Sequence, residues 1–235
     1  IKNKNILEVG PGTGNLTVAI LNKKPKKLLV VEKDDYLVSL LKKNFEDEIK
    51  IINKDILKID ENLLDSQTLT VFGNLPYNIS TEILCKWILN INNQNFWFDY
   101  LVLMFQKEVA DRIVAEVNSK NYGRLSILSN WKLDVKKICD VHPSSFSPKP
   151  KVDSSVLFFK PKKIIFKLKD PKCLEKITRI FFMHRRKMIK KPYNQLFARN
   201  NDIASKLNID LNLRPQNLDF ETYFKIAREY ENLSV

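Results

Sequence analysis

Three of the chain's five glycines lie together in one short stretch, and this clustering limits what the chain can fold into. Gly10, Gly12 and Gly14 fall within residues 6–16, which run Ile-Leu-Glu-Val-Gly-Pro-Gly-Thr-Gly-Asn-Leu from a strand pattern into a helical one. Glycine adopts backbone conformations closed to other residues and lets a ligand approach the main chain. A helix that starts at Asn15 presents free N–H groups and a partial positive charge. We therefore predict a strand, loop and helix that together bind a ligand carrying a carboxylate or phosphate.

Strand and helix patterns alternate through the first half of the chain. The strand patterns cover residues 4–9, 27–32, 49–52, 68–72 and 100–105, and helix patterns cover 16–20, 34–41, 80–89 and 108–117. Asp34 is placed to cap the second of these helices. Such alternation implies βαβ units with right-handed crossovers and a mostly parallel sheet.

In the second half of the chain, a last pair of strand patterns is followed by helical patterns alone. Residues 135–141 and 152–159 are joined by a turn-rich loop without a helix, so we expect an antiparallel hairpin at the edge of the sheet. Beyond Pro161 the patterns at 174–183, 193–198, 203–207 and 220–230 are helical. We therefore predict an α/β, Rossmann-like domain over residues 1–163 and a small all-α domain over residues 164–235.

Composition excludes several classes of protein. The 235 residues are 44% apolar, which is enough to bury a substantial core, and no apolar run approaches the roughly 18 residues that a membrane span needs. Three scattered cysteines and two histidines argue against a disulfide framework and against a metal centre, so we expect a cytoplasmic protein without a metal. Because the first residue is Ile1 and not Met, we expect the sequence to be part of a longer chain.

The net charge of +13 is concentrated in one segment. Residues 132–199 hold 19 basic and 5 acidic side chains, a net of +14, while the rest of the chain is close to neutral. A basic block of this kind indicates a surface that meets a polyanion such as nucleic acid. The alternative is a lysine-rich surface that is only solvated.

Polar residues also follow the second and third strand patterns. Glu32 ends the second strand, where a carboxylate can accept hydrogen bonds from both ribose hydroxyls of a nucleoside. Asp55 follows the third strand and could accept from an adenine amine, although a cap of a helix or turn explains it equally well. The glycines have the spacing G-x-G-x-G, which differs from the G-x-G-x-x-G of dinucleotide enzymes. With these glycines, Glu32 and Asp55, the chain resembles the Rossmann-like methyltransferases that use S-adenosylmethionine.

The fourth strand pattern ends in Gly-Asn-Leu-Pro-Tyr-Asn-Ile-Ser-Thr, residues 73–81. The amine at N6 of adenine is a poor nucleophile, and a site that methylates it can work by orientation and electrostatics without a strong base. The side-chain oxygen of Asn74 and the backbone carbonyl of Leu75 could accept the two amine hydrogens, and Tyr77 could stack on the base. The alternative is an ordinary turn, because Asn and Pro are common turn residues.

This stretch resembles the active-site motif of N6-adenine methyltransferases in the form found in the rRNA adenine dimethyltransferase family. Residues 141–154, 106–113, 122–126, 181–187 and 213–218 are similar to other signatures of that family, so the resemblance covers nearly the whole chain. It implies a catalytic set of Asn74, Leu75, Pro76, Tyr77 and Phe146, in which Phe146 closes over the flipped base from the face opposite Tyr77. It implies that S-adenosylmethionine is bound by Glu8, Gly10, Gly12, Gly14, Glu32, Asp55, Ile56 and Asn74. For RNA we expect contacts from Lys149, Lys151, Arg185, Arg186 and Lys187.

Within the family, the run of Arg185, Arg186 and Lys187 and the Arg-Pro pair at 214–215 are most similar to the bacterial KsgA type, which dimethylates two adjacent adenines near the 3′ end of small-subunit rRNA. The resemblance implies a monomeric enzyme of ribosome biogenesis whose partner is the small ribosomal subunit. Two alternatives stay open: an Erm-type enzyme that acts on large-subunit rRNA, and a non-catalytic RNA-binding assembly or transcription factor on the same fold. The family also has a Gln-Asn-Phe-Leu-like segment before the first strand, which this sequence does not contain, so we expect an incomplete cofactor site.

Overall fold

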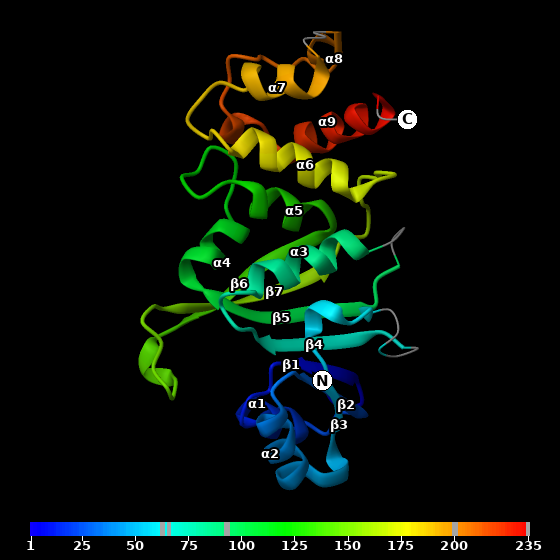
Figure 1. Cartoon of the computed structure of the whole chain (residues 1–235), viewed down its shortest axis with the longest axis vertical. Coiled ribbons are helices and arrows are strands. Elements are labelled where there is room, and N and C mark those ends of the chain that lie inside the picture. Colours follow the sequence, from blue (N-terminus) through cyan, green and yellow to red (C-terminus); the bar gives the residue numbers. More distant parts are fainter. Residues whose placement is uncertain (62–63, 65–66, 92–94, 199–201, 234–235) are drawn as a thin grey trace. The chain divides into compact units, whose positions relative to one another are not determined.

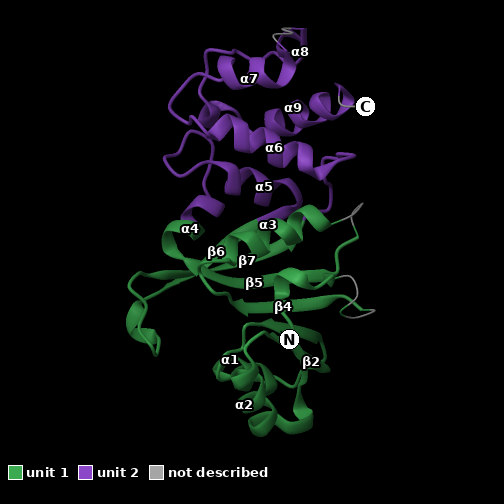
Figure 2. Ribbon diagram, viewed as in Figure 1, with its two compact units in different colours: residues 1–110, 135–161 green, residues 111–134, 162–235 purple. Residues whose placement is uncertain are grey.

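The computed structural model describes residues 1–61, 64, 67–91, 95–198 and 202–233. The chain forms two compact units (Figure 2). The first comprises residues 1–110 and 135–161, and the second comprises residues 111–134 and 162–235. No helix in the described part of the chain is long and apolar enough to cross a bilayer.

A seven-stranded sheet forms the centre of the first unit, in the order β3-β2-β1-β4-β5-β7-β6 (Figure 1). The strands are β1 (Asn5–Val9), β2 (Lys27–Glu32), β3 (Lys50–Asn53), β4 (Leu69–Asn74), β5 (Phe98–Gln106), β6 (Leu133–Val141) and β7 (Ser154–Pro161). Neighbouring strands from β3 to β5 pair in parallel, and β7 pairs antiparallel with β5. The predicted mostly parallel sheet with an antiparallel edge is therefore confirmed.

The order of the strands reverses between β1 and β4. From β1 the chain continues outward to β2 and β3, whereas β4 continues to β5 on the other side. All five residues of β1 are buried, as expected for a central strand covered on both faces. Open α/β sheets bind ligands at the carboxyl ends of the strands where such a reversal occurs. The fold therefore predicts a ligand site at the residues directly after β1 and β4.

Short helices connect the strands of the first unit. They are α1 (Asn15–Leu21), α2 (Asp35–Phe45), η1 (Glu46–Glu48), η2 (Ile56–Lys58), α3 (Ser80–Asn90) and η4 (Pro143–Ser145), and α4 (Lys107–Ile113) runs from the first unit into the second. Asp34 caps α2 as predicted, because its side chain accepts from the backbone N–H groups of Tyr36 at 2.9 Å and Leu37 at 3.1 Å. The helix expected over 108–117 ends earlier, at Ile113.

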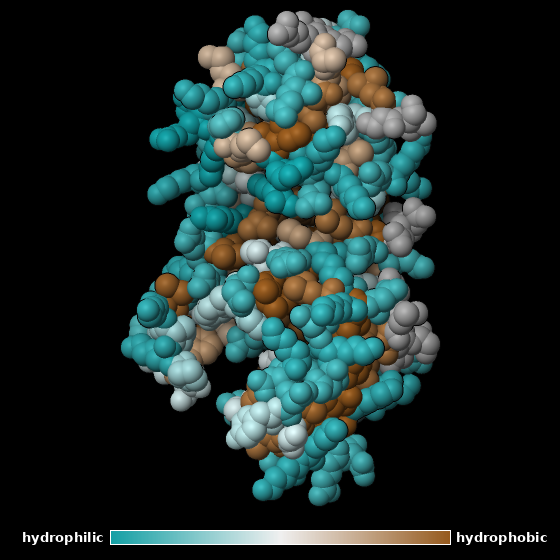
Figure 3. Space-filling model, in the orientation of Figure 1, coloured by the Kyte–Doolittle hydropathy of each residue, from teal (hydrophilic) through white to brown (hydrophobic). Residues whose placement is uncertain are grey.

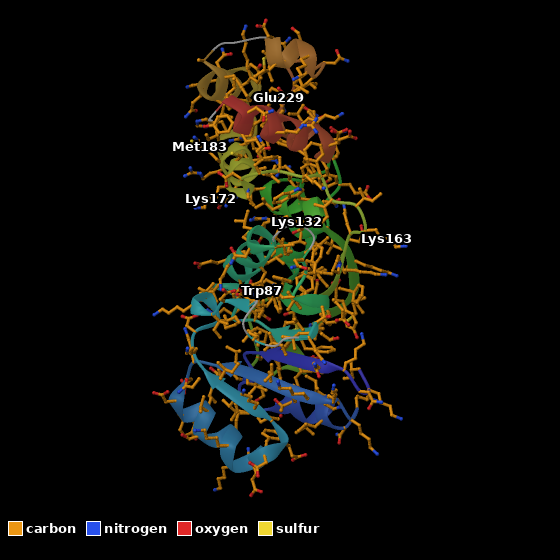
Figure 4. The ribbon with its side chains drawn as sticks, turned by 90° about the vertical axis from the view of Figure 1, so that its right-hand side faces the viewer. Trp87, Lys132, Lys163, Lys172, Met183 and Glu229 are labelled. Carbon is orange, nitrogen blue, oxygen red and sulfur yellow. The ribbon has the colours of Figure 1, made fainter. Side chains whose placement is uncertain are left out.

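Helices make up the second unit: α5 (Arg124–Lys132), α6 (Pro171–Phe182), α7 (Lys190–Phe197), α8 (Asp202–Lys206), η5 (Pro215–Asn217) and α9 (Phe220–Leu233). Buried apolar faces of α6 and α9 form its core, with Leu174, Phe181 and Tyr223 fully buried. Lysines of this unit such as Lys163 and Lys172 are exposed (Figure 4).

The boundary between the units differs from the expected division at residue 163, because residues 111–134 belong to the second unit. Hydrogen bonds explain the difference: the Tyr122 hydroxyl donates to the carbonyl of Leu218 at 2.9 Å, and Trp131 Nε1 donates to the carbonyl of Phe166 at 2.7 Å. Helix α5 also has no pattern that the sequence could reveal, since it is buried on several sides and lacks a single apolar stripe.

A buried carboxylate fixes the segment that follows β3. Glu61 is almost fully buried, and its Oε1 accepts from Lys86 Nζ at 2.5 Å and from Trp87 Nε1 at 2.9 Å. Lys86 also donates to the carbonyls of Ile56 and Ile59. Helix α3 therefore holds the chain between η2 and Glu61 in place, and with it the neighbouring Asp55.

We predict that Lys86→Met lowers the free energy of unfolding by about 2–4 kcal/mol, because it leaves a buried carboxylate and two carbonyls without their cation. Chemical denaturation monitored by circular dichroism measures this loss. The matched control is Lys42→Met on α2, where Lys42 is exposed, and its stability should stay within about 0.5 kcal/mol of the parent. Equal stability of the two variants would contradict the assignment.

Candidate active site

A cavity of about 350 Å³ opens at the carboxyl ends of the parallel strands. It lies within the first unit, and its size is within the range of small-molecule sites. It is lined by Val9, Gly10, Gly12, Val31, Glu32, Lys33, Asp34, Leu37, Lys54, Asp55, Ile56, Pro76 and Ile79. The structure therefore brings together five of the predicted cofactor residues, namely Gly10, Gly12, Glu32, Asp55 and Ile56, and one of the predicted catalytic residues, Pro76.

The glycine loop is in a conformation that other residues rarely adopt. Gly10, Gly12 and Gly14 have φ values of +70°, +57° and +92°. A Cβ atom on Gly14 would lie 2.5 Å from the ring of Phe45, so Gly14 allows α1 and α2 to pack. A Cβ on Gly12 would meet nothing within 4 Å, so the space beside Gly12 is open. Gly14 thus serves packing, and Gly12 borders the cavity.

Gly10 lies where the ends of the two central strands, β1 and β4, are adjacent. A Cβ on Gly10 would lie 3.6 Å from the carbonyl oxygen of Asn74, and the Gly10 N–H donates to the carbonyl of Val31 at 3.0 Å. In the sheet, Val9 pairs with Gly73, so the glycine loop and the motif at 73–81 leave the sheet side by side. The predicted cofactor loop and the predicted catalytic motif are therefore neighbours.

Glu32 is held in place by the backbone that follows it. Its Oε1 accepts from the N–H groups of Lys33 at 2.8 Å and Asp34 at 3.0 Å, and the residue is 9% exposed at the cavity wall. Because these bonds use Oε1, the other oxygen can accept from the hydroxyls of a ligand. A fixed carboxylate of this kind recognises a pair of neighbouring hydroxyls.

Asp55 caps a turn, which is one of the two roles that its sequence position suggested, while its role as an acceptor from adenine stays a prediction. Its Oδ1 accepts from the N–H of Leu57 at 2.9 Å and so caps η2, and the residue also lines the cavity. The cap therefore restrains the carboxylate at the cavity wall.

Glu8 lies beneath the glycine loop and is not among the residues that line the cavity. It is 1% exposed, and its Oε2 accepts from the Thr17 hydroxyl at 2.7 Å. Its Oε1 is buried without a hydrogen-bond partner within the part of the chain that the structure describes. Burial raises the pKa of the Glu8 carboxyl to about 7, although the bond from Thr17 opposes this shift. Such a carboxyl can take up or release a proton near neutral pH.

The predicted catalytic motif directly follows β4. Asn74 is exposed at the end of the strand, Leu75 is buried, and Pro76 borders the cavity. The hydroxyls of Tyr77 and Ser154 form a hydrogen bond of 2.6 Å. The exposed amide of Asn74 is therefore available to a substrate next to the cavity.

Phe146 lies in the loop between β6 and β7, residues 142–153. This loop extends beyond the sheet (Figure 1), and the space-filling view shows a hollow between it and the part of the first unit that contains α1 and α2 (Figure 3). No ring contact or hydrogen bond joins Phe146 to residues 74–77 among the described residues. The expected closure of Phe146 over a base stays a prediction. Lys149 and Lys151 are exposed on the same loop.

The three basic residues at 185–187 differ in their surroundings. Arg185 is half-buried, and its guanidinium donates to Gln216 Oε1 at 3.1 Å and to the carbonyl of Ser119 at 3.0 Å. Arg186 and Lys187 are exposed. Lys187 also borders a cavity of about 680 Å³ together with His184, Lys190 and Lys191. Arg185 therefore joins segments of the second unit, and its two neighbours face solvent.

Sequence reasoning missed Thr17 and Ser154 as partners of site residues. Nothing in the local pattern of either residue reveals its role, because both contacts depend on the tertiary fold. In contrast, Lys33, Asp34 and Lys54 directly flank predicted site residues and could have been expected at the cavity wall. Among the described residues, no cluster of histidine, cysteine, aspartate and glutamate could hold a metal ion.

Comparison with protein-family models gives a match to "Ribosomal RNA adenine dimethylase" over residues 1–232. Two curated relatives are both named "Ribosomal RNA small subunit methyltransferase A". The protein from Pelagibacter ubique is 69% identical over 99% of this chain and 88% of its own length, and that from Ehrlichia ruminantium is 44% identical over 97% and 86%.

Solved structures of other proteins also match this chain over its whole length. A dimethyladenosine transferase from Plasmodium falciparum matches with a TM-score of 0.79 and 28% identity over 100% of this chain and 93% of that one. The 23S rRNA methyltransferase ErmE matches with a TM-score of 0.67 and 18% identity over 100% and 93%, a likeness that concerns the fold alone. Because the family model spans almost every residue and the curated relatives match over nearly the whole chain, the chain belongs to the ribosomal RNA adenine dimethylase family.

Proposed function

We propose that the chain transfers methyl groups from S-adenosylmethionine to the N6 amines of adjacent adenines near the 3′ end of small-subunit rRNA, as a step of ribosome biogenesis. The observation that carries this proposal is the position of Asn74 and Pro76 beside a cavity that also contains Gly12 and Glu32. The names of the curated relatives support the small subunit as the substrate. We expect the protein to act as a monomer in the cytoplasm, where bacterial ribosomes are assembled.

The residues around the cavity fit S-adenosylmethionine. The open side of Gly12 leaves room for a ligand against the backbone, Glu32 can accept from ribose hydroxyls, and Asp55 and Ile56 border the same cavity. Glu8 precedes this loop on β1, and its Oε1, which has no hydrogen-bond partner among the described residues, could accept from an amino group through water. When bound, the cofactor supplies an electrophilic methyl group.

The protein's own contribution to the reaction is to orient the amine. Asn74 Oδ1 and the Leu75 carbonyl are proposed to accept the two N6 hydrogens, which favours a pyramidal nitrogen with its lone pair directed at the methyl group. The ring of Tyr77 is proposed to stack on the adenine. The target adenine must leave its stack to reach this site, so a loop or single-stranded end is the expected substrate.

Two alternatives remain to be separated by experiment. An Erm-type enzyme would methylate large-subunit rRNA, and a binding factor on the same fold would methylate neither. Purified small and large ribosomal subunits that lack the modification are incubated with the protein and radiolabelled cofactor, and the modified base is then mapped. Label in adjacent adenines near the 3′ end of small-subunit rRNA supports the proposal, whereas label only in large-subunit rRNA, or none, contradicts it.

The first prediction from this proposed function concerns the cofactor. Glu32→Ala should weaken S-adenosylmethionine binding by about 1–3 kcal/mol, because it removes a charged acceptor for ribose hydroxyls. Titration calorimetry measures the affinity. Glu48→Ala, in the exposed η1 turn, serves as a control that should bind like the parent. A folded Glu32→Ala protein with parent affinity would show that Glu32 does not hold the ribose.

The second prediction concerns chemistry. Asn74→Ala should lower kcat by about 100-fold or more, since orientation of the amine is the main contribution expected from the protein, while RNA affinity changes little. Single-turnover methylation and filter binding provide the two measurements. Asn78→Ala removes the same group from an exposed position four residues further on and should retain activity. If Asn74→Ala methylates at the parent rate, the proposed active site is wrong.

The third prediction separates the basic residues of the second unit. Arg186→Gln with Lys187→Gln should lower the slope of log affinity for RNA against log salt by about 1.4, at roughly 0.7 per lost phosphate contact. Arg185→Gln should instead lower the free energy of unfolding by about 1–2 kcal/mol, because it removes bonds to Gln216 and Ser119.

Both quantities are measured on the same preparations, by binding at several salt concentrations and by thermal denaturation. The control is Lys42→Gln with Lys43→Gln on α2, which makes the same change in charge in the first unit. A double variant of Arg186 and Lys187 with the parent's salt slope would exclude these residues from the phosphate contacts.

A further inference from the structure

Ser154 is a fully buried residue at the end of the family-like stretch 141–154, and its contact with Tyr77 was not predicted from the sequence. It begins β7, is 0% exposed, and forms its 2.6 Å hydrogen bond with the hydroxyl of Tyr77. Buried hydroxyls are normally paired, so the choice of partner is informative. Here the partner is the aromatic ring of the predicted catalytic motif.

The register of the sheet explains how β7 reaches this ring. Asn74 pairs with Met104 on β5, and β5 continues two residues further to Gln106. Ser154 pairs with Gln106, so it lies past the end of β4, on the side where the chain continues to Tyr77. The backbone bond from Lys107 to the carbonyl of Asp153, at 2.9 Å, fixes the start of β7. Ser154 is therefore held by the sheet and not by a mobile loop.

Two bonds together restrict Tyr77 at both ends. The Ser80 hydroxyl donates to the backbone carbonyl of Tyr77 at 3.2 Å, and Ser154 holds the phenol hydroxyl. A tyrosine has only two side-chain torsions, and holding its backbone and its hydroxyl fixes χ1 and therefore the position of the ring. The hydroxyl lies on the axis of χ2, and its preference for hydrogen bonds in the plane of the ring then favours one ring orientation. A ring that stacks on a base must have a defined plane, because stacking depends on the relative orientation of the two faces.

We propose that Ser154 is a positioning residue that holds the ring of Tyr77 in place for stacking on the target adenine. The proposal rests on the proposed function, since it requires an adenine at this site. Ser154 also directly follows the loop that contains Phe146. Ser154 therefore bonds to one of the two aromatic residues expected on opposite faces of the adenine, Tyr77, and it ends the loop that contains the other, Phe146.

The chain offers a matched control in the next residue. Ser155 is also 0% exposed, but its hydroxyl donates to Asp140 at 2.6 Å and has no bond to Tyr77. Ser155→Ala therefore makes the same chemical change in the same buried strand without altering the ring. A general effect of removing a buried hydroxyl from β7 would appear in both variants.

The experiment is a double-mutant cycle of Ser154→Ala and Tyr77→Phe, with kcat and KM measured on small ribosomal subunits that lack the modification. Each single variant should lower kcat by about 10-fold or more, with KM for the subunit within about twofold of the parent. The double variant should be no slower than the slower single variant, because both changes remove one hydrogen bond. Ser155→Ala should stay within about twofold of the parent, and calorimetry should give unchanged cofactor affinity for all four proteins.

Several results would overturn the proposal. A Ser154→Ala protein with the parent kcat does so directly, and so does a double variant whose loss is the product of the two single losses. If Ser154→Ala does not fold, Tyr77→Phe decides, since a parent-like kcat without the phenol hydroxyl excludes any role for the bond. A parent that methylates no adenine on either subunit refutes the proposed function itself, whereas an active parent with unchanged variants refutes only the role of Ser154.

Discussion

The close approach of two backbone segments, at Gly10 and Asn74, is the constraint on which the candidate site depends. It occurs where the sheet reverses its order, between β1 and β4, and Gly10 has a φ of +70° there, which residues with a side chain rarely adopt. The glycine loop then borders the cavity from one side and the motif after β4 from the other. In the proposed reaction a methyl donor and an acceptor amine must meet, and the closeness of the two segments proposed to bind them comes from backbone packing.

Carboxylates around this junction are held by local hydrogen bonds. Glu32 accepts from the two residues after it, and Asp55 caps the turn that follows it. Lys86 donates to one carbonyl in that turn and to another just beyond it. Each acceptor is thus oriented by its own strand end or loop. Preorganisation of this kind lowers the cost of ordering the site when a ligand binds.

Much of the first unit could be predicted from sequence because its signals are local. The strand patterns, the clustered glycines and the Asn-Leu-Pro-Tyr motif each lie within a few residues, and the structure has the predicted strands within about two residues of their expected bounds. Helix α5 could not be predicted, since burial on several sides removes the periodic stripe that identifies a helix. The bond between Tyr77 and Ser154 depends on the register of β5 with β7, and the tether of Arg185 depends on Ser119 and Gln216, so neither is encoded in any short stretch of the chain.

The root of the loop between β6 and β7 is closed by its own set of contacts. Asp140 accepts from the Ser155 hydroxyl and pairs with Lys107 at 3.0 Å and Lys137 at 2.7 Å, and these partners hold its pKa well below the usual range. The entropy lost in closing a loop grows only with the logarithm of its length, so residues added or removed beyond a fixed root change folding stability little. The loop arises from the two strands at the antiparallel edge of the sheet. A lineage can therefore change the length or charge of the parts of this segment outside Phe146, to suit a different RNA surface, at little cost in folding stability.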